Sequence, residues 1–126
     1  MGVAAKQRVG GAVEFAADLA RGLVDFDQGD LAHGALTMTF GLSAWMRRCS
    51  VGFEEAWAGA TVLRIALLES AGLDRATEPV PLRAADAKTA LVSMTVYLDD
   101  LVSRAQRLTS RGRSEVIADA LDLLAA

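Results

Sequence analysis

The sequence predicts a mainly α-helical protein, with a three-helix region at the N-terminus and a strand-helix-helix module at the C-terminus. The chain has 126 residues, 52% of them hydrophobic, and only two prolines, which is typical of a single well-packed helical unit. Apolar residues recur at helical spacing through most of it. Residues 92–98 alternate between apolar and polar, as a half-buried strand does.

The first helix is expected over about residues 5–26, where apolar residues stand three and four positions apart. The turn DFDQGD follows, in which Gly29 can take a positive φ and Asp30 can cap the next helix. That second helix is expected over Leu31–Arg48. Because it is apolar on nearly all sides, neighbouring helices should surround it.

The third helix is expected over about Val51–Ala71, with Ser50 as its cap and Gly72 as its stop. Its pattern places Leu67 in the core and Arg64 in water.

Both prolines stand in the segment GLDRATEPVPLRAAD. Residues before proline are pushed out of the helical backbone region, so 77–80 is expected to be extended. This boundary divides the chain into a helical region over 1–72, a linker over 73–88 and a module over 89–126.

The module has two interpretations. In the first, VSMTVYL over 92–98 is a strand, Asp99 caps one helix and Ser114 caps a second. In the alternative, a heptad-like apolar seam runs unbroken from Ala87 to Leu108. Residues 82–110 are then the long fourth helix of an all-α antiparallel bundle, followed by a short fifth helix from Ser114 to Ala125.

At TVYLDD and RSEVIADAL the chain resembles the ribbon-helix-helix family of repressors and antitoxins, over about the last 35 residues. The resemblance implies a homodimer, because the strand needs a partner strand, and the paired strands would enter the major groove of duplex DNA. It places Ser93, Thr95 and Tyr97 at base edges, and Arg113 and Ser114 at a phosphate. These five residues are the predicted DNA-binding site.

The net charge of -3 excludes a uniformly basic nucleic-acid binder, but the charge is uneven along the chain. Residues 83–113 hold six Lys and Arg against three Asp and Glu. A local basic strip is therefore expected within an acidic protein.

No pattern of catalytic residues is present in the sequence. Glu54 and Glu55 are adjacent and point about 100° apart on a helix, so they do not share a pocket. His33 is read as a packed histidine, and Cys49, the single cysteine, as a small buried hydrophobe. We expect no enzyme, no cofactor and no metal, and a lone cysteine suits a reducing cytoplasm.

Residues 31–46 carry no formal charge, which raises the question of a membrane span. They are shorter than the roughly 20 apolar residues that a span needs, so no membrane association is expected.

The predicted function is a cytoplasmic homodimeric DNA-binding regulator or antitoxin-like protein, whose apolar N-terminal helices bind a protein partner or a ligand. The alternative is a non-enzymatic all-helical adaptor or assembly protein that binds a protein partner.

Overall fold

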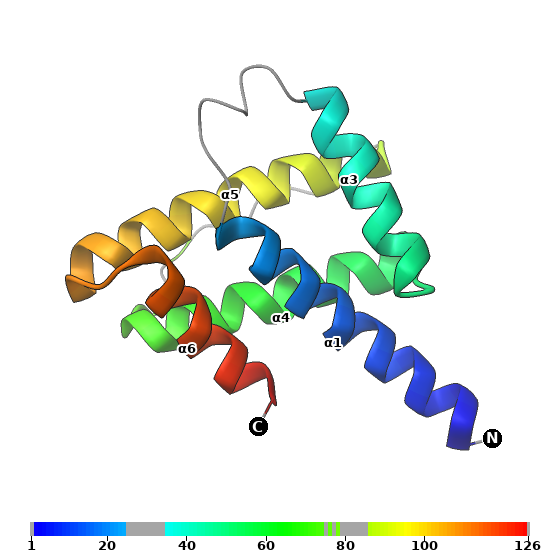
Figure 1. Ribbon diagram of the computed structural model, residues 1–126, viewed down its shortest axis with the longest axis horizontal. Helices are drawn as coiled ribbons and strands as arrows, with labels where there is room; N and C mark the ends of the chain where they lie inside the picture. Colours follow the sequence, from blue (N-terminus) through cyan, green and yellow to red (C-terminus); the bar gives the residue numbers. More distant parts are fainter. Residues whose placement is uncertain (1, 25–34, 75, 77, 79–85, 126) are drawn as a thin grey trace.

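The computed structural model describes residues 2–24, 35–74, 76, 78 and 86–125, with side chains for 11–24, 41–74, 76, 78 and 86–125. The described residues form five helices and no strand (Figure 1). The helices are α1 (Gly2–Val24), α3 (Ala35–Arg48), α4 (Phe53–Ala71), α5 (Ala87–Thr109) and α6 (Arg113–Ala125). The mainly α-helical prediction is therefore confirmed, in its all-α form.

Some predicted features lie outside the described residues. They are the turn with Gly29 and Asp30, the start of the second helix at Leu31, His33, and most of the extended segment 77–80.

Helix α4 is the centre of the fold. Helices α1, α5 and α6 all pack on it, and α1 and α6 also contact each other (Figure 1). Helix α1 comes close to α4 at Gly59, where a Cβ would lie 2.5 Å from the carbonyl oxygen of Ala12. A residue without a side chain is needed there because the obstacle is backbone.

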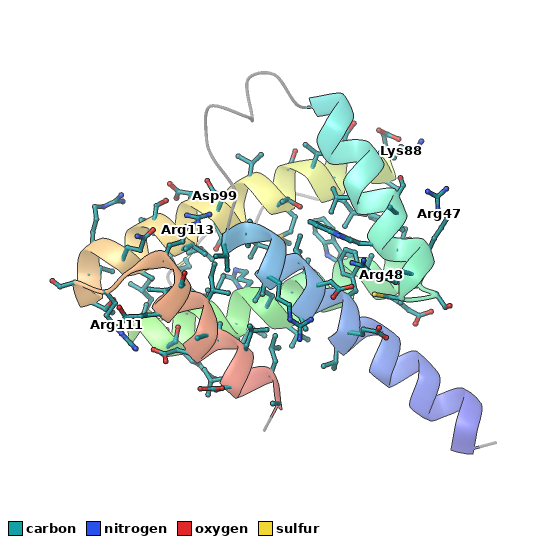
Figure 2. The ribbon with its side chains drawn as sticks, viewed as in Figure 1. Arg47, Arg48, Lys88, Asp99, Arg111 and Arg113 are labelled. Carbon is teal, nitrogen blue, oxygen red and sulfur yellow. The ribbon has the colours of Figure 1, made fainter. Side chains whose placement is uncertain are left out.

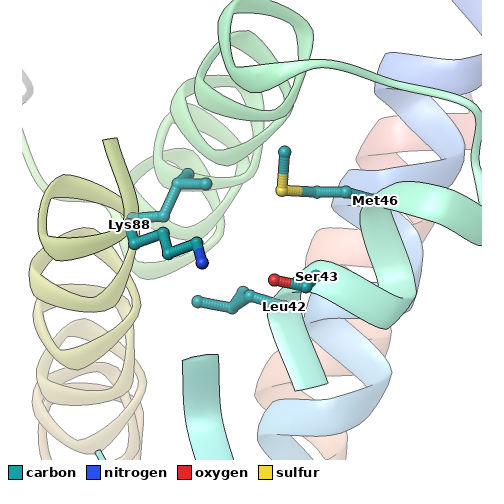
Figure 3. A pocket seen from close by; sticks show the side chains of 5 residues that line it. Leu42, Ser43, Met46 and Lys88 are labelled. Atoms are coloured by element: carbon teal, nitrogen blue, oxygen red, sulfur yellow. The ribbon is translucent and has the colours of Figure 1, made fainter. Parts of the chain in front are cut away.

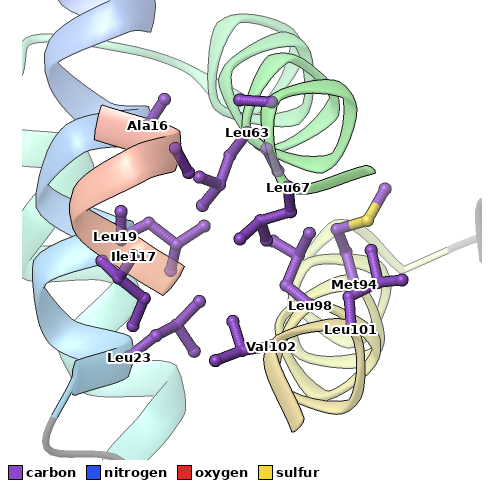
Figure 4. Packing of buried hydrophobic residues seen from close by; sticks show 14 of the residues in the cluster. Ala16, Leu19, Leu23, Leu63, Leu67, Met94, Leu98, Leu101, Val102 and Ile117 are labelled. Carbon is purple, nitrogen blue, oxygen red and sulfur yellow. The ribbon is translucent and has the colours of Figure 1, made fainter. Parts of the chain in front are cut away.

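One apolar core joins these four helices, as Figure 4 shows. It contains Leu19 and Leu23 of α1, Leu63 and Leu67 of α4, Met94, Leu98, Leu101 and Val102 of α5, and Ile117 of α6. Helices from both sides of the predicted linker over 73–88 thus share a core, and the division into regions 1–72 and 89–126 stays a prediction.

Helix α3 lies at the periphery and packs mainly on α5 and, less closely, on α1 (Figure 1). Its contact with α1 places the Trp45 ring against Gly22, where a Cβ would lie 2.5 Å from the ring. The described helices therefore do not surround α3, contrary to the expectation from its apolar sequence.

The turn from α3 to α4 differs from the predicted cap. Ser50 has a φ of 56° and ends α3, so it does not cap α4. Gly52, in extended backbone, is the N-cap of α4. The predicted stop is confirmed, since Gly72 has a φ of 70° and closes α4 with backbone hydrogen bonds to Glu69 and Leu68.

The prediction that residues 92–98 form a strand is wrong, because they lie in the middle of α5. Met94, Leu98 and Leu101 are buried at helical spacing, whereas Val96, which the strand would bury, is 40% exposed. The β-branched Thr95 is accommodated because its hydroxyl donates to the carbonyl of Leu91, 2.8 Å away. The apolar pattern at helical spacing over 87–108 therefore determines the structure of this segment, and the seven-residue alternation over 92–98 does not.

The predicted helix caps of the module are also wrong. Asp99 is a buried residue inside α5. The N-cap of α5 is Asp86, whose Oδ2 accepts hydrogen bonds from the backbone and hydroxyl of Thr89, at 3.0 and 2.6 Å. Helix α6 begins at Arg113, so Ser114 lies within its first turn.

Candidate functional site

The five predicted DNA-binding residues do not form one surface. Thr95 is buried and lies about 200° around the helix from Ser93 and Tyr97, since each helical residue advances about 100°. Ser93 is exposed and Tyr97 is half-buried. Arg113 and Ser114 begin α6, where Ser114 is exposed and Arg113 is engaged within the protein. The helix removes the ribbon on which the predicted base contacts depended.

Tyr97 takes part in a buried polar contact between α4 and α5. Its hydroxyl accepts a hydrogen bond from Nε of Arg64, 3.0 Å away, and Nη2 of Arg64 donates to the carbonyl of Glu78 at 3.1 Å. Arg64 is only 6% exposed, so the expectation that it faces water is wrong. A buried guanidinium is tolerable because these acceptors satisfy it.

The carboxylate of Glu78 is held by Arg104 of α5. Nη1 and Nη2 of Arg104 each donate to one carboxylate oxygen at 2.9 Å, a two-pronged geometry. Hydrogen bonding from Arg104 lowers the pKa of Glu78 below its ordinary value, with the charges of Arg104 and Arg64 adding to the effect. Arg64 and Arg104 together fasten the chain at Glu78 to α4 and α5.

A second charged pair, Arg113 with Asp99, connects α6 to α5 at a point where both lie beside the end of α1. Nη2 of Arg113 donates to the carboxylate of Asp99, and Nε of Arg113 donates to the carbonyl of Leu23. Asp99 is 1% exposed. This pair explains why a charged residue can occupy the middle of α5, and it gives Arg113 a structural partner in place of a phosphate.

The predicted basic strip is largely neutralised by neighbouring acids. Arg104 also lies 3.2 Å from Asp100, although the geometry is not that of a hydrogen bond, and Arg111 pairs with Glu115 and Asp119. Among the described cations of the strip, Lys88 and Arg107 are the exposed ones outside such pairs. The local excess of positive charge in the sequence therefore does not become a continuous basic surface.

Cys49 lies at the end of α3 beside a charged cluster. Its thiol donates to Oδ2 of Asp18 at 3.6 Å, and Nε of Arg48 donates to the same oxygen at 3.0 Å. Burial raises the pKa of the thiol to about 11, and the negative charges of Asp18 and Glu14 add to the rise. The thiol is therefore protonated at neutral pH and a poor nucleophile.

A small recess lies between α3 and the start of α5 (Figure 3). Its apolar side consists of Leu42, Met46 and Leu91, and its polar groups are the Ser43 hydroxyl and the Lys88 ammonium. The volume is about 20 Å³, room for about one water-sized group. Sequence reasoning missed this recess because Ser43 and Lys88 are far apart in the chain.

No described group of three or more His, Cys, Asp and Glu residues is arranged to hold a metal ion. Among the described helices, none is both long and apolar enough to cross a membrane. No protein-family model, curated protein or solved structure matches the chain. The resemblance to the ribbon-helix-helix family therefore rests on its residues alone.

Proposed function

We propose that the protein is a non-enzymatic all-helical adaptor or assembly protein that binds a protein partner through α3. The observation that carries this proposal is the position of α3. Its residues from Ala35 to Met46 include no charged side chain, yet the helix lies at the periphery of the fold. A helix of such composition is stable in water when neighbours cover it, and a partner protein would provide that cover.

The described side chains of α3 fit this proposal. Leu42 is buried against α5, whereas Trp45 and Met46 are only partly buried and Ala44 is exposed. Partly buried Trp and Met are residue types that protein interfaces favour.

The buried charges support a structural role for the other helices. Arg113 with Asp99, and Arg64 and Arg104 with Glu78, each join separate parts of the chain. These charged groups bind other parts of the same protein. We therefore assign α1, α4, α5 and α6 a structural role, which is to hold α3 in position for the partner.

Site-specific photo-crosslinking in the cells that produce the protein tests this proposal. A photoreactive amino acid replaces Ala44 on α3 or, as the matched control, Ala118 on α6; both alanines are exposed and helical. We expect a defined protein adduct from position 44 and none from position 118. Absence of an adduct at 44, or the same adducts at both positions, would contradict the proposal.

DNA binding stays a second prediction, now without a ribbon to support it. Binding through phosphates should weaken steeply with salt because counterions are released. Fluorescence anisotropy with a labelled duplex at low salt tests it, and undetectable binding would exclude the regulator. A homodimer is no longer required by an unpaired strand, and sedimentation velocity measures it directly.

A further inference from the structure

Two hydrogen-bond donors converge on the recess between α3 and α5. Figure 3 shows the ammonium group of Lys88 and the hydroxyl of Ser43 pointing toward each other across the opening. No hydrogen bond or ion pair joins either group to another described side chain. The charge of Lys88 contributes to lowering the pKa of Asp86, the N-cap of α5, but Oδ2 of Asp86 already accepts two hydrogen bonds from Thr89. The pair can therefore donate to an acceptor from outside.

The size and lining of the recess restrict that acceptor. A space of about 20 Å³ takes about one water-sized group, such as one carboxylate oxygen at the end of a side chain, and excludes a metabolite of ordinary size. Leu42 and Leu91 are almost completely buried, so they form an apolar floor beside the two donors. A carboxylate next to an aliphatic group matches this combination.

The charge around the recess points the same way. Arg47 is exposed on the same outer side of the molecule as Lys88 (Figure 2), and no described acid pairs with it. Arg48, the next residue, turns instead to Asp18 at 2.8 Å. A partner at the recess thus meets Lys88 in its lining and Arg47 one helical turn beyond Ser43, although the protein as a whole is acidic.

We propose that this recess docks an acidic amphipathic helical segment of a protein partner. One carboxylate of the segment accepts hydrogen bonds from Nζ of Lys88 and Oγ of Ser43, and an aliphatic side chain one turn away covers Met46. A second carboxylate faces Arg47. The inference rests on the proposed function, since it names the chemistry of the partner that α3 binds.

The probe is a fluorescein-labelled helical peptide of about 15 residues, in which Leu stands at helical spacing and Glu fills the other face. The control peptide has Lys in place of every Glu. Anisotropy at low salt should show binding of the Glu peptide and none of the Lys peptide. Lys88→Glu should weaken binding about tenfold or more, because a like charge then meets the carboxylate.

Arg107→Glu is the matched control variant, because it makes the same charge change at the other exposed end of α5. We expect it to weaken binding less than about twofold, and Ser43→Ala to weaken it about threefold by removing one donor. Equal losses from Lys88→Glu and Arg107→Glu, or equal binding of both peptides, would overturn the inference.

The two proposals can fail separately. If crosslinking at position 44 gives a protein adduct but the Glu peptide does not bind, the acidic partner is wrong and partner binding through α3 stands. If the Glu peptide binds at Lys88 but no adduct forms in cells, the recess recognises acidic helices and the adaptor function is wrong.

Discussion

Helices α4 and α3 are both apolar, but the protein treats them differently. Three helices pack on α4, whereas α3 packs mainly on α5 and α1 from one side (Figure 1). The sequence of α4 includes charged residues and that of α3 has none before Arg47. Hydrophobicity alone therefore does not indicate which helix becomes the centre. One feature of α4 is Gly59, which lets the backbone of α1 approach it closely.

The largest expected effect comes from shortening a core leucine of α4. Leu67→Ala should lower the free energy of unfolding by roughly 2–5 kcal/mol, since the surrounding helices cannot collapse into the cavity. The paired variant Leu42→Ala in α3 should cost only about 2 kcal/mol, because its cavity opens onto the recess. Urea denaturation measures both, and equal losses would contradict the distinction between the helices.

Two glycines sharpen the same comparison. Gly59→Ala should destabilise by about 1–3 kcal/mol, because its Cβ meets the backbone of α1. Gly41→Ala in α3 should stabilise by about 0.5–1 kcal/mol, since no atom of the described residues lies within 4 Å of the added Cβ and alanine favours the helix. Thermal unfolding followed by circular dichroism gives both signs. The same sign for the two variants would show that the helices do not differ in packing.

The contact of Glu78 with Arg104 of α5 should make the stability of the protein depend on pH. Its pKa is lowered by Arg104 in the folded protein, so the stabilisation is complete above the ordinary glutamate pKa of about 4.3 and is lost as pH falls through the lowered value. Glu78→Gln should cost roughly 1–2 kcal/mol at pH 7 and flatten the loss of stability on acidification. Arg107→Gln, an exposed residue of the same helix, is the control. An unchanged acid profile in Glu78→Gln would remove this role.

The smallest effect concerns Cys49, at the junction of the two helices. With a pKa near 11 and a buried sulfur, it should react with iodoacetamide at neutral pH far more slowly than a free thiol. The rate should exceed that expected from global unfolding, because α3 can open while α4 stays packed. A rate equal to that of global unfolding would mean that α3 and α4 open together.

In the all-helical interpretation, helical periodicity predicted both ends of α4 and α6 and the C-terminal end of α5 to within two residues, but it placed the start of α5 at 82 and not at Ala87. The signal was strong because each helix buries a repeating stripe, such as Leu91, Leu98 and Ala105 of α5. The strand prediction failed because the alternation over 92–98 is too short to exclude a helix. In α5, Met94 and Leu98 are buried while Val96 is exposed. The apolar pattern also predicted that Leu108 would be buried, whereas its side chain is 61% exposed.

The charged contacts could not be predicted in the same way. The pairs of Arg113 with Asp99 and of Arg64 with Tyr97 depend on how helices cross, which local spacing does not contain. Arg64 stands four residues after Ala60 and three before Leu67, on the buried stripe of α4, and was expected in water only because of its charge. For the recess, one signal existed, namely an uncharged segment that ends in two arginines, but its pairing with Lys88 required the packing of α3 on α5.

The direction of α4 and α5 has a consequence for how the chain can be divided. Figure 1 shows the two helices running the same way, so the end of α4 and the start of α5 lie at opposite ends of the pair, and α4 with its 19 residues is about 28 Å long. A break near Ala76, which is exposed, would leave one piece with α1, α3 and α4 and another with α5 and α6. Each piece carries a part of the core that only the other piece covers, so separately produced pieces should reassemble into the native protein, and the molecule could serve as a split reporter.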